Sequence, residues 1–85
     1  MYRIVYRKEA ARALLKMPRN TARLIREKLE RLAHDPAAPN PNVKPLADEQ
    51  AFRVRVGDWR VIYELRHDEL VVLVLRIGPR GGIYR

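Results

Sequence analysis

The spacing of the apolar residues changes once along this chain, from the repeat of a helix to the repeat of a strand, and this change restricts the fold more than any other feature. Between Lys8 and Leu32 two apolar sets recur at intervals of three and four residues: first Ala10, Ala13, Leu14 and Met17, then Ala22, Ile25, Leu29 and Leu32. Such intervals place apolar side chains on one face of a helix. Because Pro18 interrupts the two patterns, we expect two helices that form a hairpin.

The segments on either side of the helices are expected to differ in structure. Residues 2–7 (YRIVYR) are β-branched and aromatic and too short for a helix, so they predict a first strand. Residues 36–45 hold four of the six prolines. A segment so rich in proline is incompatible with a helix or a central strand, and we expect an ordered loop there.

The second half of the chain has the repeat of a β-sheet. Phe52, Val54 and Val56 alternate with arginines, and Gly57 and Asp58 offer a two-residue turn before residues 59–66 (WRVIYELR). Residues 70–77 (LVVLVLRI) are apolar on both faces until Arg76, which is typical of an interior strand. We expect the first strand to pair beside it.

These elements predict an α+β fold in the order β-α-α-β-β-β, with the helix hairpin packed on one face of a small mixed, mainly antiparallel sheet. A chain of 85 residues can form one two-layer core, and we expect a single domain over residues 1–85.

The charge of the chain suggests a polyanionic partner. The formal net charge is +8, and among 18 basic residues only Lys8, Lys16, Lys28 and Lys44 are lysines. Arginine favours planar partners such as phosphate, although a solvated basic surface explains charge alone equally well.

Other classes of function are disfavoured by what the chain lacks. There is no cysteine, and His34 and His67 are the only histidines, so we expect no metal site. No apolar run reaches the length of a membrane span and the N-terminus does not resemble a signal peptide, so we expect a cytoplasmic protein without a membrane partner.

The predicted hairpin brings three arginines together. With Gly57 and Asp58 as the loop, Arg55 lies opposite Arg60 and Arg53 opposite Ile62, and directly paired residues share a face. Paired like charges destabilise two strands, a cost that an anionic ligand would remove. In an alternative interpretation, Arg53 and Arg55 protect an exposed edge strand against further pairing. That alternative does not account for Arg60, so we favour an anion site.

The remaining candidates are structural when taken singly. Arg80 follows the interior strand, where an ordinary surface arginine is the simplest interpretation, and Tyr84 in the terminal segment could merely cover the core. His34 lies near a helix end and His67 in a polar turn, and a structural role is the simplest assignment for both. Trp59 and Tyr63 are most simply core residues, and Asp58 and Glu64 are isolated carboxylates.

At this point the whole chain resembles a known family. The order of elements, together with "KPL" before the hairpin, "RVGDWRVIYEL", "VVLVLRIG" and the closing "IYR", is similar to RelE-type toxins of the RelE/ParE superfamily. The resemblance implies a toxin of a type II toxin-antitoxin system that cuts messenger RNA in the ribosomal A site without metal or cofactor. It also implies a RelB-like antitoxin and the ribosome as partners.

The family's functional residues fall on five positions of this chain. Its two basic residues on the strand before the turn correspond to Arg53 and Arg55, its arginine after the turn to Arg60, its arginine after the last long strand to Arg80, and its near-terminal tyrosine to Tyr84. Because arginine is a poor base, we expect Arg53, Arg55 and Arg60 to bind phosphate and Tyr84, Arg80 and Arg60 to be catalytic, with Tyr84 as the base.

Two alternatives to this function remain open. A ParE-like protein of the same superfamily would bind gyrase without performing chemistry of its own. A plain RNA-binding module, or a copy whose toxicity has decayed, is the third possibility.

Overall fold

A computed structural model describes residues 1–47 and 50–79 of the chain. It contains two helices and five strands within these ranges, in the order β1 (Arg3–Tyr6), α1 (Lys8–Lys16), α2 (Arg19–His34), β2 (Val43–Pro45), β3 (Ala51–Val56), β4 (Trp59–Arg66) and β5 (Val71–Pro79). The predicted α+β class and the predicted order of helices and long strands are confirmed.

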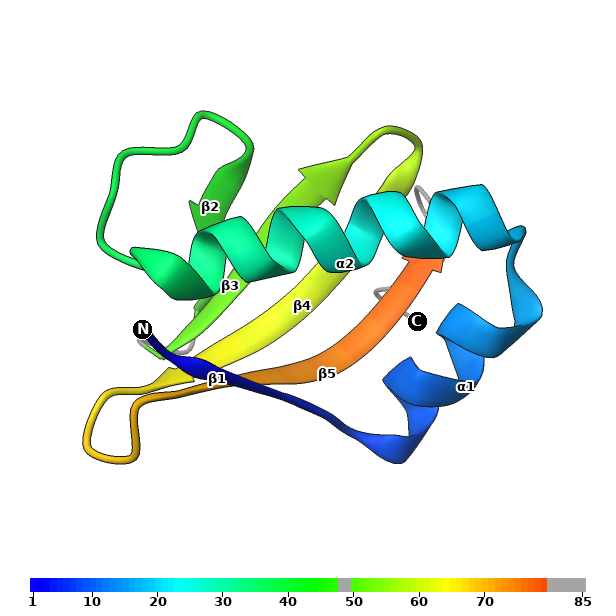
Figure 1. Cartoon of the computed structure of the whole chain (residues 1–85). Coiled ribbons are helices and arrows are strands. Elements are labelled where there is room, and N and C mark those ends of the chain that lie inside the picture. Colours follow the sequence, from blue (N-terminus) through cyan, green and yellow to red (C-terminus); the bar gives the residue numbers. More distant parts are fainter. Residues whose placement is uncertain (48–49, 80–85) are drawn as a thin grey trace.

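The five strands form one mixed sheet in the order β1-β5-β4-β3-β2 (Figure 1). Only β1 and β5 run parallel, and the other three pairs are antiparallel. The expectation that the last strand is interior and that the first strand pairs with it is therefore confirmed. A parallel pair needs a long connection, and here the chain between β1 and β5 contains both helices and the strands β2, β3 and β4.

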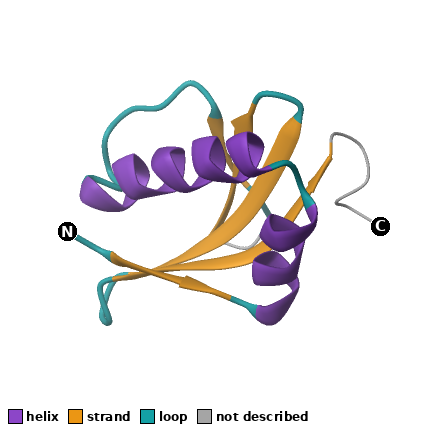
Figure 2. Cartoon of the chain, turned by 45° about the vertical axis from the view of Figure 1, so that its right-hand side comes forward, coloured by secondary structure: helices purple, strands orange, loops and turns teal. Residues whose placement is uncertain are grey.

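Both helices lie on one side of this sheet (Figures 1 and 2). The helix α2 crosses the strands obliquely, and α1 lies at the edge beside the last part of β5. The two helices meet at Met17 and Pro18, which both have extended backbones. Met17 is extended because a residue before proline is driven out of the helical region. One corner therefore ends α1 and starts α2.

The core lies between α2 and the covered face of the sheet. Its largest fully buried side chains come from one helix and the two central strands, and they are Ile25, Leu29, Val61, Tyr63, Val72 and Val74. Fully burying an aliphatic side chain of this kind contributes about 1.5–3 kcal/mol. The ring of Tyr63 also stacks on Phe52, with the ring centroids 5.6 Å apart.

The turn between β3 and β4 has the geometry that its sequence predicts. Gly57 adopts a φ of +59°, a left-handed conformation that glycine reaches without steric cost. The resulting register pairs Val56 with Trp59 and Arg55 with Arg60, as predicted.

An irregularity between β4 and β5 keeps the core continuous. The register shifts between Ile62 and Tyr63, so that Tyr63 pairs with Val74 whereas Ile62 pairs with Arg76. One extra residue in β5 is accommodated there, as in a β-bulge. Val74 and Ile77 therefore both face the helices although three positions separate them.

One prediction about the proline-rich segment is wrong. We expected a loop over residues 36–45, but its last three residues form the strand β2, which pairs with Phe52, Arg53 and Val54. The three-residue β2 is the edge of the sheet, where a proline without an N–H can be accommodated. The expected order β-α-α-β-β-β thus lacked one short strand.

The N-terminus is attached to both layers of the fold. The backbone N–H of Tyr2 donates to the carbonyl of Ala33 at 2.8 Å, and its hydroxyl lies 2.7 Å from Nδ1 of His67. The same two rings make an edge-to-face contact with centroids 5.8 Å apart. His67 therefore has the structural role that its turn position suggested.

No helix in residues 1–47 and 50–79 is long and apolar enough to span a membrane.

Candidate anion-binding face

The three arginines of the hairpin lie on the sheet face opposite the helices. Val54, Val56 and Val61 are buried beneath the helices. Because side chains alternate along a strand, Arg53, Arg55 and Arg60 lie on the other face, which neither helix covers. This sheet surface is called the arginine face below.

The strand that carries Arg53 and Arg55 is not an edge strand. β2 pairs with β3 from Phe52 to Val54, and the N–H of Arg55 donates to the carbonyl of Asn42 at 2.9 Å. The alternative that these arginines protect an exposed edge therefore loses its basis. Arg53 is half-buried, whereas Arg55 remains exposed.

Four further basic residues share this face by register. Lys44 pairs with Arg53, Arg76 pairs with Ile62, and Arg3 and Arg66 both pair with Val71 at the other end of the sheet. Neither Lys44 nor Arg76 was predicted from the sequence as a site residue. Arg76 stands out in the sequence because it is a charged residue within the apolar strand β5. The face of the sheet on which it lies could not be predicted, because the face depends on the bulge in β5.

The arginine face carries few carboxylates. Among the strand residues that the structure describes, Glu64 is the only carboxylate on this face, and its Oε1 accepts from Nε of Arg66 at 3.0 Å. The end of the face around Arg53, Arg55 and Arg60 therefore has an excess of positive charge. Surfaces of this kind attract phosphate and raise the rate of encounter with polyanions.

The contact of Arg60 is long and that of Arg76 is exposed. Nη1 of Arg60 donates to the carbonyl of Trp59 across 3.4 Å, a long bond that holds the side chain only weakly. Nε of Arg76 lies 3.7 Å from Oε2 of Glu9 on α1, and both side chains are at least half exposed. Such guanidinium groups bind anions and stabilise negative charge but do not act as bases.

Two tyrosines of the described residues, Tyr6 and Tyr63, are poorly suited to proton transfer at neutral pH. Burial raises the pKa of Tyr63 to about 12. Burial also raises the pKa of Tyr6, with a smaller opposing effect of Arg26 and a small reinforcing effect of Glu30. The predicted catalytic residues Arg80 and Tyr84 lie outside the described residues. Of the three predicted catalytic residues, Arg60 is thus the one whose position the structure describes.

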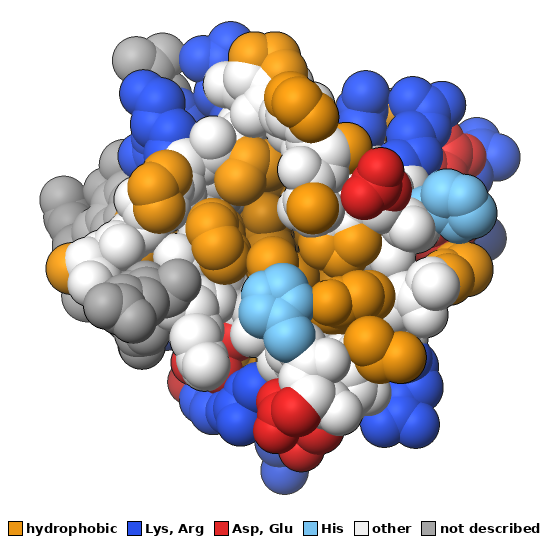
Figure 3. Space-filling model, turned by 90° about the vertical axis from the view of Figure 1, so that its left-hand side faces the viewer, with side chains coloured by type: hydrophobic (Ala, Val, Ile, Leu, Met, Phe, Trp, Pro, Cys, Tyr) orange, Lys and Arg blue, Asp and Glu red, His pale blue; other side chains and the backbone are white. Residues whose placement is uncertain are grey.

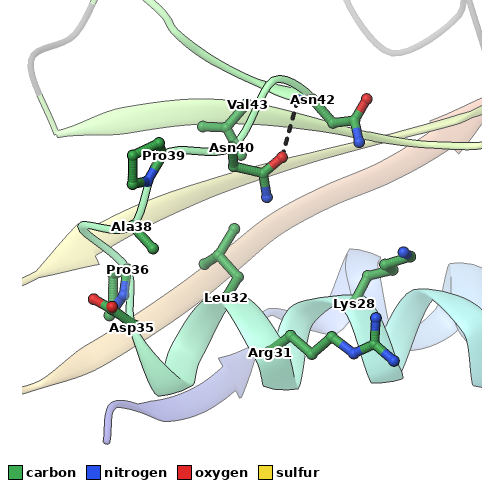
Figure 4. A pocket seen from close by; sticks show the side chains of 10 residues that line it. All are labelled: Lys28, Arg31, Leu32, Asp35, Pro36, Ala38, Pro39, Asn40, Asn42 and Val43. Carbon is green, nitrogen blue, oxygen red and sulfur yellow. Dashed lines mark hydrogen bonds between the residues drawn. The ribbon is translucent and has the colours of Figure 1, made fainter.

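A cavity lies at the end of the molecule where α2 finishes and the loop before β2 begins. Figure 3 shows hydrophobic side chains gathered at that end, with charged residues around them. The cavity has a volume of about 410 Å³ and opens between the C-terminal half of α2 and the loop. Lys28 and Arg31 lie at its helix side, Leu32 points into it, and Asn40 and Asn42 lie on the loop side (Figure 4). Since Val43 lines this cavity and Lys44 faces away from it, β2 separates the cavity from the arginine face.

Groups that bind a metal ion are not assembled in the described part of the chain. No three His, Asp or Glu side chains of residues 1–47 and 50–79 lie close enough together to hold an ion. His34 is exposed at the last position of α2.

The chain matches one protein family over nearly its whole length. The model of the family described as "ParE toxin of type II toxin-antitoxin system, parDE" matches residues 2–84. A curated protein of Methanocaldococcus jannaschii named as a toxin RelE1 is 24% identical over 86 residues, which cover 99% of this chain and 96% of that protein.

Solved structures with the same fold come from both archaea and bacteria. The RelE–RelB complex of Pyrococcus horikoshii contains a chain with a TM-score of 0.82 and 29% identity, covering 95% of this chain and 97% of that one. The toxin-antitoxin complex RelBE2 of Mycobacterium tuberculosis gives a TM-score of 0.77 and 27% identity, with 93% and 98% covered. The fold is therefore that of RelE toxins.

The pairing of Arg55 with Arg60 predicts an unusual response to substitution. Arg55→Ala and Arg60→Ala should each leave the free energy of unfolding unchanged or raise it by a few tenths of a kcal/mol, because each removes a like-charge contact. Urea denaturation followed by circular dichroism measures this change. The prediction fails if both variants are destabilised by more than about 1 kcal/mol, the typical effect of a point substitution.

The raised pKa of Tyr63 predicts a loss of stability in alkali. The folded protein favours the neutral phenol of Tyr63 over the ionised one. The contribution of Tyr63 to the free energy of unfolding is therefore complete below pH 10 and is lost as the pH rises toward 12. At about 1.4 kcal/mol per pKa unit, the loss from Tyr63 amounts to roughly 2–3 kcal/mol. In Tyr63→Phe the alkaline decline should be smaller by this amount in urea denaturation series. Equal declines in the two proteins would show that Tyr63 does not titrate in this way.

Proposed function

The chain belongs to the ParE toxin family of type II toxin-antitoxin systems, and from this premise we propose that it is a ribosome-dependent endoribonuclease that cuts messenger RNA in the ribosomal A site. It is RelE-like in fold and in its similarity to named toxins. The proposal adds the reaction, the substrate and the roles of individual residues.

The observation that carries the proposal is the arginine face. Arg55 directly opposes Arg60, and Arg53 lies one pair farther from the turn on the same face. The directly paired like charges of Arg55 and Arg60 repel each other, which is unfavourable in the free protein. A bound phosphodiester backbone would remove that repulsion, and base-independent contacts of this kind position a nucleic acid strand.

The proposed reaction divides three tasks among the side chains. The 2′-hydroxyl of a ribose must lose its proton, the pentavalent phosphate must be stabilised, and the 5′-oxygen of the next nucleotide must gain a proton. Arg53 and Arg55 hold the phosphate, and Arg60 stabilises the charge that develops on it. Tyr84 takes the proton from the 2′-hydroxyl, and Arg80 stabilises or protonates the leaving 5′-oxygen. The products are a 2′,3′-cyclic phosphate and a 5′-hydroxyl.

The requirement for the ribosome follows from the weakness of these groups as acids and bases. Arginine and tyrosine have pKa values far from neutrality in their unperturbed state, so proton transfer to them is inefficient. Holding the messenger RNA in a reactive geometry compensates for such inefficiency. The ribosome provides that orientation, and a toxin of this kind acts in the cytoplasm.

A second function has one observation in its favour. The matching family is described by its ParE toxins, and a ParE-like member would act by binding gyrase. The two functions leave different traces in arrested cells. Messenger RNA cut within codons with intact chromosomes supports the endoribonuclease, whereas DNA double-strand breaks with intact messages support the gyrase-binding alternative.

Substitutions should separate the roles within the proposed site. Tyr84→Phe removes only a hydroxyl, so cleavage on programmed ribosomes should fall by about two to four orders of magnitude with little change in ribosome binding. Arg53→Ala and Arg55→Ala should weaken both binding and cleavage, because a phosphate contact acts before and during the reaction. Their deficits should shrink as salt rises, since each variant has lost one salt-dependent contact.

Single-turnover assays with analysis of the RNA ends measure these effects. Arg23→Ala, on the exposed side of α2, is the matched control for loss of one positive charge. Cleavage by Tyr84→Phe at the parent rate would remove Tyr84 from the reaction.

We also propose a RelB-like antitoxin as the inhibitory partner. The related chains of Pyrococcus horikoshii and Mycobacterium tuberculosis were solved as toxin-antitoxin complexes. A chain with a net charge of +8 is complementary to an acidic, amphipathic segment that wraps its edges and helices. The carboxylates of that segment would lie on the arginine face or displace the segment that carries Tyr84.

Hydrogen exchange of the complex tests this mode of inhibition. Binding of the antitoxin should protect the amides of β3 and β4, and charge-reversal variants Arg55→Glu and Arg60→Glu should weaken the complex more than Arg23→Glu does. If the complex leaves β3, β4 and the C-terminal segment as accessible as in the free toxin, inhibition works by another route.

A further inference from the structure

The arginine face continues beyond the hairpin in a straight row across the sheet. Successive pairing places Lys44 of β2, Arg53 of β3, Ile62 of β4 and Arg76 of β5 directly beside one another. Neighbouring strands are about 4.8 Å apart, so the row from β2 to β5 extends over about 14 Å. It therefore exceeds the reach of a single phosphate group.

We propose that Lys44 and Arg76 are two further RNA-binding residues, and that the RNA backbone runs along this row, perpendicular to the strands. This inference rests on the proposed function and assigns the path of its substrate. Arg53 holds a phosphate near the centre of the row, and Lys44 and Arg76 hold phosphates on either side of it. The half-buried Ile62 between Arg53 and Arg76 offers an apolar surface for a ribose or a base.

The local electrostatics support this path. Lys44 and Arg53 form a like-charged cross-strand pair, the second on this face after Arg55 and Arg60. The next row toward the turn ends at Gly78, which pairs with Arg60 and adds no charge on β5. Among the described strand residues, positive charge therefore reaches both β2 and β5 along the Arg53 row only, and this row defines the direction.

Each of the two residues also has a structural explanation, and the two explanations make different predictions. A lysine on the edge strand β2 can prevent edge-to-edge association. Arg76 forms an exposed ion pair with Glu9, and such pairs contribute about 0–1 kcal/mol. Either role would affect association or stability, and neither would affect binding to RNA.

Substitution of Glu9 distinguishes an RNA-binding role of Arg76 from a purely structural one. Its carboxylate lies 3.7 Å from Nε of Arg76 and would repel a phosphate on that arginine. Glu9→Gln removes the negative charge with little change of shape. It should tighten RNA binding, whereas a purely structural ion pair predicts at most a small loss of stability.

Fluorescence anisotropy with uridine oligonucleotides of graded length tests the row in the full chain. We expect Arg76→Ala and Lys44→Ala to bind a dinucleotide like the parent and to lose affinity for longer RNA. Each should lower the slope of log K against log salt by about 0.7, the value for one phosphate contact in a single strand. Arg23→Ala is the charge-matched control and Arg53→Ala the control for the central contact.

The outcomes separate this inference from its premise. Suppose that Arg53→Ala weakens binding while Arg76→Ala and Lys44→Ala bind every length like the parent. The proposed RNA path along the row is then wrong, but RNA binding by the arginine face is supported. If Arg53→Ala also binds like the parent, the arginine face does not bind RNA and both proposals fall. Loss of affinity in both outer variants with tighter binding by Glu9→Gln supports the row.

Discussion

The two-residue turn at Gly57 and Asp58 sets the register on which the charged surface of this protein depends. Its geometry requires a positive φ at Gly57, and it pairs Arg55 with Arg60 and Val54 with Val61. A shift by one residue would turn the valines of β3 away from the helices and the arginines into the core. Burial of the valines therefore enforces the like-charge contact on the opposite face. The cost of that contact is small compared with the energy of the core that maintains it.

The rest of the sheet extends this arrangement in both directions. On one side, β2 adds Lys44 beside Arg53 and removes the edge from β3. On the other side, the irregularity at Ile62 and Tyr63 lets β5 keep Val74 and Ile77 in the core while Arg76 joins the arginine face. The helices occupy the other face, so the charged surface stays accessible on the described strands. Core packing and the proposed RNA path are thus two consequences of one set of strand pairings.

Much of this architecture could be predicted from the sequence because it depends on local patterns. The helical spacing from Ala10 to Leu32, Pro18 between the helices and the glycine of the turn each act over a few residues, and each prediction is confirmed. The strand β2 was missed because its proline content disfavours a strand and only the edge position permits one. Arg76 was missed as a site residue because its face depends on a bulge that no local pattern announces. The roles of Arg53, Arg55, Arg60, Arg80 and Tyr84 remain predictions.

The central claim is that messenger RNA lies on the arginine face when this toxin acts. The most direct measurement is the structure of the protein on a ribosome programmed with messenger RNA that carries a 2′-deoxy substitution at the cleavage position and so cannot be cut. We expect the A-site phosphate within hydrogen-bonding distance of Arg60 and of Arg53 or Arg55, with the flanking backbone crossing the sheet from β2 to β5. Messenger RNA held against the helices, with the arginine face turned toward solvent, would contradict it.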